Sequence, residues 1–434
     1  MRAMKDSGIE WIGEIPQGWN TTQIKYCMEI DREKLSEKTD PEYTFQYIDI
    51  SGVTEYGGIG ETTEMTFEKS PSRARMVVKP GDTIISTVRT YLKAVAYIDS
   101  LGDHICSTGF CVLSPKKNLF PKFAYYVLQS DYVVQKIVSE SVGVSYPAIS
   151  SMEIGDIKIA LPEYVVQACI ADYLDTKCAE IDALIAAKEK TNALLKERRQ
   201  SIIYEAVTKG LDPTVPMKDS GVEWIGEIPE GWSVGKTIFA LSMPITDGPH
   251  ETPELLNDGI PFVSAEAVSS GNGRIDFDHI RGFISKEYYE ECSKKYKPQI
   301  NDIYMIKSGA TTGKVALVDT DRIFTIWSPL AVFRTDDERC NYRYLFYFLQ
   351  SDAYQKQVEI NWTYGTQQNI GMRSLEKLLM CFPPVDEQVA IADHLDKSCD
   401  RLGELIRIND AAIQQLKEYR QSLIYEAVTG KIEV

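Results

Sequence analysis

The stretch Glu163–Thr208, EYVVQACIADYLDTKCAEIDALIAAKEKTNALLKERRQSIIYEAVT, decides the fold. It contains neither proline nor glycine and is rich in Ala, Leu, Ile, Lys and Glu, which lose little free energy on entering a helix. Pro162 stands just before it and Gly210 just after it, the usual punctuation of a helix. The stretch predicts one helix roughly 65–70 Å long. Its own turns cannot bury its apolar stripe, so it needs a partner along its length.

A second copy of this pattern, Gln388–Thr429, follows 221 positions later in the same chain. Both copies carry a heptad stripe with one polar residue, Lys188 or Asn409, in the middle. The predicted core positions of the coiled coil are Leu174, Ile181, Lys188, Leu195, Ile202, Leu395, Leu402, Asn409, Leu416 and Leu423. A central polar position costs stability but fixes register, although a solvated break in an ordinary amphipathic helix is the alternative. We expect the two helices to form an intramolecular antiparallel coiled coil.

Composition indicates a soluble globular protein of two to four domains, since 44% of its 434 residues are hydrophobic and 25% are charged. No run is long and apolar enough to span a membrane, and no apolar signal segment opens the chain, so we expect a cytoplasmic protein. The nine cysteines form no CxxC pair and the four histidines have no ligand spacing, which favours reduced thiols and no metal site. The net charge of −16 argues for only modest nonspecific affinity for DNA phosphates.

The chain opens with a box, Met4–Trp19, that returns as Met217–Trp232. Val222 replaces Ile9 and Glu230 replaces Gln17, and the other positions are identical. Glycine and proline punctuate the box, which predicts an extended, turn-rich segment. It is too short to fold alone, so we expect it to pack on the end of a long helix.

Between each box and the following long helix lies a mixed unit with strand-like runs and one helix. The expected strands are 45–50, 82–86, 94–98 and 110–113 in the first unit, and 261–264, 302–306, 314–318 and 330–333 in the second. The expected helices are 120–140 and 342–359. Outside these landmarks the two units barely match. A duplicated frame with divergent middles is typical of a scaffold that carries two differently tuned recognition surfaces.

With these repeats in view, the whole chain resembles the specificity subunit of a type I restriction–modification enzyme (the HsdS family). The residues that carry the resemblance are the duplicated box Ser7–Pro16 and Ser220–Pro229, the segment Leu161–Ala171 and the segment Phe382–Ala392. One small departure is Val166, which stands where the second copy has Glu387.

The resemblance implies that each mixed unit is a target recognition domain that reads one half of a bipartite, gapped sequence in double-stranded DNA. The helices would set the spacing and dock two modification (methyltransferase) subunits, and restriction subunits would complete the assembly. S-adenosylmethionine, ATP and Mg are then expected on the partner subunits and no cofactor on this chain, which would be a non-catalytic subunit in phage defence.

The expected fold class is therefore α+β, with two mixed α/β target recognition domains separated by two long antiparallel helices. The domains are target recognition domain 1 (1–160), the first long helix (161–209), target recognition domain 2 (210–381) and the second long helix (382–434). Antiparallel packing predicts that the two recognition domains lie at opposite ends of the helices, related by approximate two-fold symmetry. Two half-sites with a fixed gap would follow.

Candidate DNA contacts come from polar and basic segments of the two units, and Arg89, Lys93, Lys314 and 367–369 are favoured because they lie on polar, basic loops at matching points. They are Arg73, Arg75, Arg89, Tyr91, Lys93, Ser145 and Tyr146 in the first unit, and Lys307, Thr311, Thr312, Lys314, Gln367, Gln368 and Asn369 in the second. Lys and Arg neutralise phosphates or read guanine, and Gln and Asn can bind adenine through two hydrogen bonds. For each residue, a solvated surface side chain remains the alternative.

Enzymatic interpretations have little support in the sequence. The segment Gly309–Lys314 has too few residues between its glycines for a P-loop, and Val315 stands where Ser or Thr is needed. The segment Cys381–Val385 has the two prolines of an adenine methyltransferase motif but neither of its flanking residues. We expect no catalytic residue. A coiled-coil scaffold that reads no sequence and a self-sufficient methyltransferase remain the alternatives.

Overall fold

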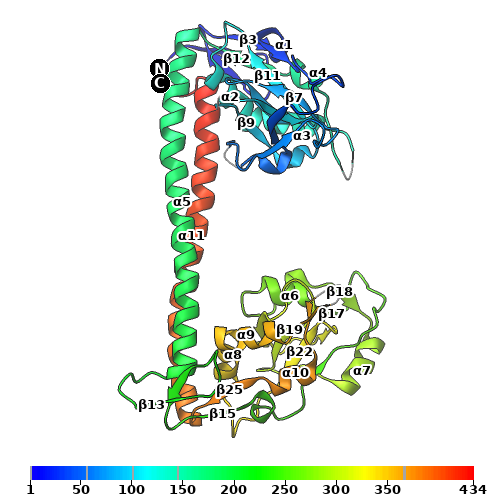
Figure 1. Cartoon of the computed structure of the whole chain (residues 1–434), viewed down its shortest axis with the longest axis vertical. Coiled ribbons are helices and arrows are strands. Elements are labelled where there is room, and N and C mark those ends of the chain that lie inside the picture. The colour runs from blue at the N-terminus through cyan, green and yellow to red at the C-terminus, as the bar shows by residue number, and fades with distance from the viewer. Residues whose placement is uncertain (1, 55–56, 100–101, 144–145, 365–367) are drawn as a thin grey trace. The chain divides into compact units, whose positions relative to one another are not determined.

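The computed structural model describes residues 2–54, 57–99, 102–143, 146–364 and 368–434, and its contacts divide the chain into two compact units. Unit 1 comprises residues 1–190 and 409–434, and unit 2 comprises residues 191–408. Each unit holds one mixed domain together with part of both long helices, α5 (Tyr164–Lys209) and α11 (Val385–Val428) (Figure 1). None of the helices among the described residues is long and apolar enough to cross a membrane.

The two long helices are confirmed, with ends within a few residues of the predicted ones. In unit 1, Lys188 Nζ donates to Asn409 Oδ1 at 3.3 Å and Asp182 Oδ1 lies 2.9 Å from Arg420 Nε. As residue numbers rise along α5 they fall along α11, so the pairing is antiparallel. In unit 2 the end of α5 shares one apolar core with the start of α11. The predicted core positions divide into buried Leu174, Ile181, Leu395 and Leu423, and half-buried Lys188, Leu195, Ile202, Leu402, Asn409 and Leu416.

The domain of unit 1 contains two four-stranded sheets, ordered β6-β5-β10-β7 and β4-β11-β8-β9. Only the β5–β10 pair is parallel in these two sheets as described. The strands are β4 (Met28–Ile30), β5 (Thr44–Ile48), β6 (Thr63–Thr66), β7 (Ala74–Val78), β8 (Thr83–Ser86), β9 (Val95–Tyr97), β10 (His104–Ser107) and β11 (Phe110–Pro115). Strand β8 (TIIS) lies at an inner position of its sheet and is buried along its whole length, including Thr83 and Ser86.

The domain of unit 2 repeats the second of these sheets as β16-β22-β19-β20 and has a three-stranded sheet ordered β18-β17-β21. The strands are β16 (Thr246–Asp247), β17 (Ile260–Val263), β18 (Gly282–Ile284), β19 (Ile303–Ile306), β20 (Val315–Leu317), β21 (Thr325–Ile326) and β22 (Leu330–Phe333). Between β17 and β19 the chain forms helices α6 (Ala265–Ser270) and α7 (Lys286–Lys295), where unit 1 has strands β6 and β7. The shared sheet and the differing middles agree with the duplication seen in the sequence.

The single helices expected at 120–140 and 342–359 are wrong, because each is two helices that meet at a serine. The elements are α2 (Pro121–Gln129), α3 (Asp131–Glu140), α8 (Tyr342–Gln350) and α9 (Asp352–Ile360). Ser130 and Ser351 are extended, with ψ of 142° and 150°. Each hydroxyl donates to the carbonyl three residues before it, which offers the backbone an alternative to the helical ladder. Asp131 and Asp352 then favour a new helix start.

The repeated box forms a hairpin in each unit, and it packs on a long helix as expected. The hairpin strands are β1 (Met4–Asp6), β2 (Glu14–Pro16), β13 (Met217–Asp219) and β14 (Glu227–Pro229). In unit 1 the Tyr425 hydroxyl donates to the carbonyls of Trp11 and Ile12, at 3.2 and 3.3 Å. In unit 2 the Tyr204 hydroxyl donates to the carbonyl of Ile225 at 3.1 Å.

A repeated glutamine ties each domain to the first turn of a long helix. In unit 1, Gln167 Nε2 donates to the Pro162 carbonyl at 2.8 Å and Oε1 accepts from Phe120 N at 2.8 Å. In unit 2, Gln388 makes the equivalent bonds to the Pro383 carbonyl at 2.9 Å and from Asn341 N at 2.8 Å. Both side chains are buried. The repeated glutamine therefore holds the fold together.

Candidate nucleic-acid interface

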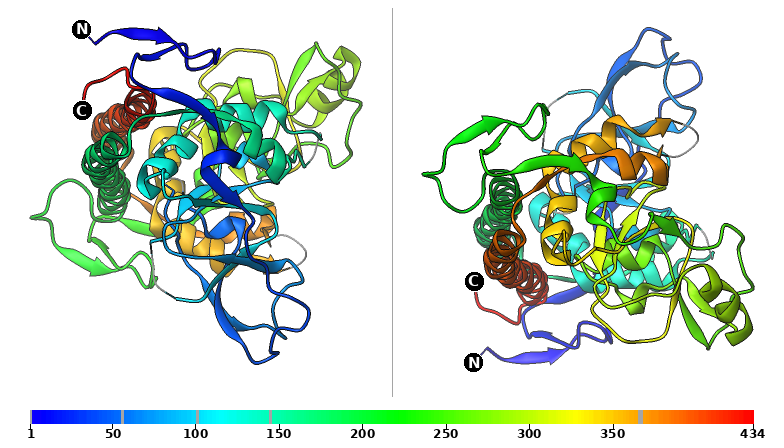
Figure 2. Two further views of the ribbon diagram at one scale, coloured as in Figure 1. Left: turned by 90° about the horizontal axis from the view of Figure 1, so that it is seen from above. Right: turned by 90° about the horizontal axis from the view of Figure 1, so that it is seen from below.

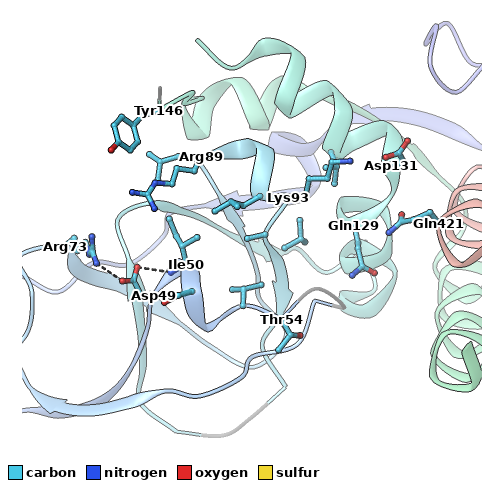
Figure 3. A pocket seen from close by; sticks show the side chains of 17 residues that line it. Asp49, Ile50, Thr54, Arg73, Arg89, Lys93, Gln129, Asp131, Tyr146 and Gln421 are labelled. Carbon is cyan, nitrogen blue, oxygen red and sulfur yellow. Dashed lines mark hydrogen bonds and ion pairs between the residues drawn. The ribbon is translucent and has the colours of Figure 1, made fainter. Parts of the chain in front are cut away.

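A cleft of about 980 Å³ in unit 1 gathers several of the predicted contact residues (Figure 3). Its walls come from the segment after β5, the segment before β7, the loop after β8, the break between α2 and α3, and α11. The predicted contact residues that line it are Arg73, Arg89, Lys93 and Tyr146. Four predicted residues from three separate parts of the sequence thus line one cleft.

The loop after β8 displays its side chains through an unusual backbone. Arg89 and Lys93 both have φ of 52°, a left-handed conformation that non-glycine residues adopt only where their surroundings impose it. Between them, Thr90 is buried and its hydroxyl donates to Ser141 Oγ at 2.8 Å. Arg89 N donates to the Pro147 carbonyl at 2.9 Å. Thr90 anchors the centre of the loop, while Tyr91 stays 54% exposed and Arg89 and Lys93 are exposed.

The three cations of the cleft have different surroundings. Arg73 Nη2 donates to Asp49 Oδ2 at 2.6 Å and Nε to the Tyr47 hydroxyl at 3.3 Å, and these bonds raise the pKa of Arg73. The Arg89 guanidinium lies 5.2 Å from the centre of the Tyr146 ring. Neither Arg89 nor Lys93 has a carboxylate partner among the described residues.

Arg75 lies apart from the other predicted residues of unit 1. Its guanidinium is 4.6 Å from the centre of the Phe67 ring and donates to the Ala74 carbonyl at 2.9 Å. It is not among the residues that line the cleft. The predicted contact Ser145 lies outside the described residues.

In unit 2 the loop after β19 carries Lys307, Thr311, Thr312 and Lys314, and it runs beside Gln368 and Asn369 as an adjacent strand would. Gly309 N donates to the Gln368 carbonyl at 3.0 Å, and Ile370 N donates to the Lys307 carbonyl at 2.9 Å. Thr311 and Thr312 are half-buried, while Asn369 and Lys314 are exposed, and Lys314 Nζ lies 3.5 Å from the Ser269 carbonyl oxygen. Gln367 lies outside the described residues.

Lys307 is buried rather than presented to solvent. Its Nζ lies 3.4 Å from Asp247 Oδ2, and Lys295 Nζ and His250 Nε2 lie 2.6 and 3.1 Å from the same carboxyl group. Burial opposes ionisation of Asp247, but the surrounding cations outweigh it and lower the pKa of Asp247. This ion pair gives Lys307 a structural role in the domain, and its prediction as a DNA contact stays untested.

The two loops occupy equivalent positions but differ in the cations that they expose. In each unit the loop follows a buried central strand and pairs with the segment before a short helix, α4 (Ser151–Asp156) or α10 (Met372–Lys377). The bridges Val88–Ala148 and Ser308–Asn369 mark the match. Unit 1 exposes Arg89 and Lys93 on this loop, whereas unit 2 exposes Lys314. The shared position agrees with the duplicated framework predicted from the sequence. The different exposed cations agree with two different recognition surfaces.

Sequence reasoning missed several residues of the unit 1 cleft. The polar ones that the cleft adds are Asp49, Ser51, Thr54, Gln129, Asp131 and Gln421. Gln129 and Asp131 belong to a Gln-Ser-Asp triplet that recurs at 350–352, and Gln421 to an Arg-Gln-Ser triplet that recurs at 199–201. These repeats were visible in the sequence, but they predicted only helices and not a contribution to the cleft.

No group of three or more His, Cys, Asp or Glu side chains suited to a metal ion occurs in the part of the chain that the structure describes. All nine cysteines are free.

Comparison with known proteins gives one consistent result. The family model for the type I restriction modification DNA specificity domain matches residues 16–196 and 249–418. The chain is 23% identical to the EcoKI specificity subunit of Escherichia coli K12, covering 97% of this chain and 90% of that one. It is 26% identical to the MjaVIII specificity subunit of Methanocaldococcus jannaschii, over 68% of this chain and 67% of that one.

One solved structure has the same fold along nearly the whole length. It comes from work on complex assembly and conformational transition of the type I R-M system, and it aligns with a TM-score of 0.71 at 23% identity. The alignment covers 96% of this chain and 99% of that chain.

Proposed function

Because the chain belongs to the type I restriction modification DNA specificity family, we propose that its two units each read one half of a bipartite, gapped sequence in double-stranded DNA. As a specificity subunit it carries DNA-recognition domains. The observation that carries the proposal is the pair of equivalent loops, 87–93 and 307–314, which share a position and differ in the cations that they expose. Two copies of one frame with unlike surfaces are suited to two unlike half-sites.

We further propose that α5 and α11 set the gap between half-sites and dock two modification subunits. Large apolar side chains stay exposed on these helices, namely Leu184 and Tyr419 in unit 1 and Leu194, Leu405 and Ile408 in unit 2. Where such side chains form a contiguous patch, they mark a surface that binds other proteins, and we propose that they do so here. Leu184 and Leu405 stand at equivalent positions of the repeat, so the same kind of docking surface would occur once in each unit.

In this proposal the chemistry belongs to partner subunits and the chain itself is not an enzyme. The modification subunits bring S-adenosylmethionine and methylate the DNA, and restriction subunits bring ATP and Mg for cleavage. The complex acts in the cytoplasm, where its DNA lies. Support comes from the relatives, which are named specificity subunits.

Footprinting of the chain in complex with its modification subunits tests the proposal. We expect protection of two short tracts separated by an unprotected gap, and methylation within those tracts. One uninterrupted protected tract would contradict the bipartite reading, and protection without sequence preference would favour a coiled-coil scaffold.

The self-sufficient methyltransferase is tested separately with the isolated chain. Equilibrium binding of radiolabelled S-adenosylmethionine should give no saturable signal for this chain alone and one site for each modification subunit in the complex. Saturable binding by the isolated chain would contradict the division of labour proposed here.

A further inference from the structure

The cations of the unit 1 cleft differ in how they are held, and we propose that this difference assigns them different tasks on DNA. Arg73 reads the major-groove edge of a G·C base pair, with Asp49 and Tyr47 as positioning residues. Arg89 and Lys93 contact the phosphate backbone. The inference rests on the proposed function, because it names the readout within the half-site of unit 1.

Arg73 is fixed at one edge and open at the other. Its Nε donates to the Tyr47 hydroxyl at 3.3 Å and its Nη2 donates to Asp49 Oδ2 at 2.6 Å. Asp49 is itself held, because its Oδ1 accepts from Ile50 N at 2.8 Å (Figure 3). Tyr47 is buried. The Nη1 hydrogens and the second Nη2 hydrogen remain for a ligand, on a side chain that is 56% exposed.

This open edge matches guanine, since two parallel N–H donors of an arginine fit the O6 and N7 acceptors of that base. The guanidinium is already held at two points, so it loses little side-chain freedom on binding. Directional recognition of a base needs such preorganisation more than contact with a phosphate does.

The carboxylate of Asp49 argues against a phosphate as the ligand of Arg73. A carboxylate 2.6 Å from the guanidinium already matches its charge and would repel a phosphate oxygen. The same carboxylate is an acceptor, and the partner base of guanine offers the amino group of cytosine beside O6. Arg73 and Asp49 together therefore present donors and an acceptor in the pattern of one G·C pair.

Arg89 and Lys93 have the opposite character. Both are exposed on the loop that Thr90 anchors through its hydrogen bond to Ser141. Neither has a carboxylate partner among the described residues. Arg89 lies against the ring of Tyr146, which is 67% exposed. Uncompensated positive charge at the rim of a cleft is what a polyanionic backbone attracts, and such contacts make affinity depend on salt.

The test compares variants of the full chain in complex with its modification subunits, on the DNA target that the wild-type complex methylates. Arg73→Lys keeps the charge and removes the planar fork, and Arg89→Ala and Lys93→Ala remove charge. Lys117→Ala is the matched control, because Lys117 is an exposed cation outside the cleft and its removal should leave binding within about twofold of wild type. Thermal melting confirms that each variant is folded.

We expect Arg73→Lys to lower affinity for the target by roughly 10- to 100-fold and to make one G·C pair in one half-site replaceable without further loss. Replacing that guanine by 7-deazaguanine should weaken binding of the wild-type complex by a similar factor. The same replacement should not change binding of the Arg73→Lys complex. Asp49→Asn should weaken the same discrimination. Arg89→Ala and Lys93→Ala should lower affinity equally for all sequences and reduce the slope of log K against log salt by about 0.9 for each lost contact.

Two results would overturn the assignment while leaving the proposed function intact. One is a wild-type target preference that Arg73→Lys does not change at any base pair. The other is a change of base preference, with the salt slope unaltered, in Arg89→Ala or Lys93→Ala. A wild-type complex without any base preference would overturn the proposed function itself.

Discussion

The indole N–H of Trp232 donates to Glu387 Oε2 at 3.0 Å, and this bond has no counterpart in unit 1. Trp19 occupies the equivalent position, and its Nε1 is buried with no hydrogen-bond partner among the described residues. The residue equivalent to Glu387 is Val166, the one departure noted in the first copy of the signature. An unsatisfied buried donor costs stability, so a single substitution has left a local defect in unit 1.

Val166→Glu should repair this defect and stabilise unit 1 by about 1 kcal/mol. The new carboxylate would accept from Trp19 and would also stand in the first turn of α5, where the helix dipole favours negative charge. Urea denaturation measures the change. The matched control is Glu387→Val, which should destabilise unit 2 by a similar amount, and a Val166→Glu protein no more stable than wild type would contradict the account.

Asp247 gives unit 2 a stability that depends on pH. Because its pKa is lowered in the folded domain, its ion pairs stabilise the fold above the unfolded pKa of about 3.9 and are lost as pH falls through the folded value. Asp247→Asn leaves Lys307 buried without its counter-charge and should cost about 3 kcal/mol at pH 7. In urea denaturation at a series of pH values, the difference in free energy of unfolding between wild type and Asp247→Asn should narrow below about pH 4. A constant difference from pH 7 to pH 3 would count against this role of Asp247.

At the scale of elements, the polar pair in the middle of the long helices is the feature with a testable consequence. Lys188 and Asn409 lie at the same heptad step and meet at 3.3 Å within unit 1. This contact supports a register-setting pair over two independent solvated breaks.

Replacing both residues, Lys188→Leu with Asn409→Leu, should raise the melting temperature or allow α5 and α11 to pair in a shifted register. Cysteine pairs placed along unit 1 and crosslinked with a short reagent report the register, and calorimetry reports the melting temperature. If both stay as in the wild type, the polar pair has no role in register.

Elements whose signal is local were predictable from the sequence, and those that depend on distant partners were not. The long helices and the core strands β8, β11, β19 and β22 follow from composition and apolar runs. Strand β6 is short and mostly polar, so its sequence alone gives little strand signal and its pairing with β5 stabilises it. The break at Ser130 was missed because the apolar pattern continues across it. At the site, cations were visible in the sequence, but the bond from Arg73 to Asp49 spans 24 positions and needs the folded sheet.

At the scale of the whole molecule, the proposal that α5 and α11 set the gap predicts the result of lengthening both. One extra heptad in each helix adds about 10 Å, which corresponds to about three base pairs of DNA. We expect the complex to stop methylating its original target and to use the same half-sites only with a longer gap. Genome-wide mapping of methylated adenines measures this, and continued use of the original gap would show that the helices do not set it.

The opening hairpin and the end of α11 lie side by side within unit 1 (Figure 2). Gly430 stands against Pro16 and Trp19, and Pro16 pairs with Met4 in the opening hairpin. A short added peptide could therefore close the backbone into a ring, and a cut in the exposed stretch 211–214 would supply new ends. A chain rearranged in this way should fold with unit 1 intact, because the contacts between the opening hairpin and the end of α11 are kept.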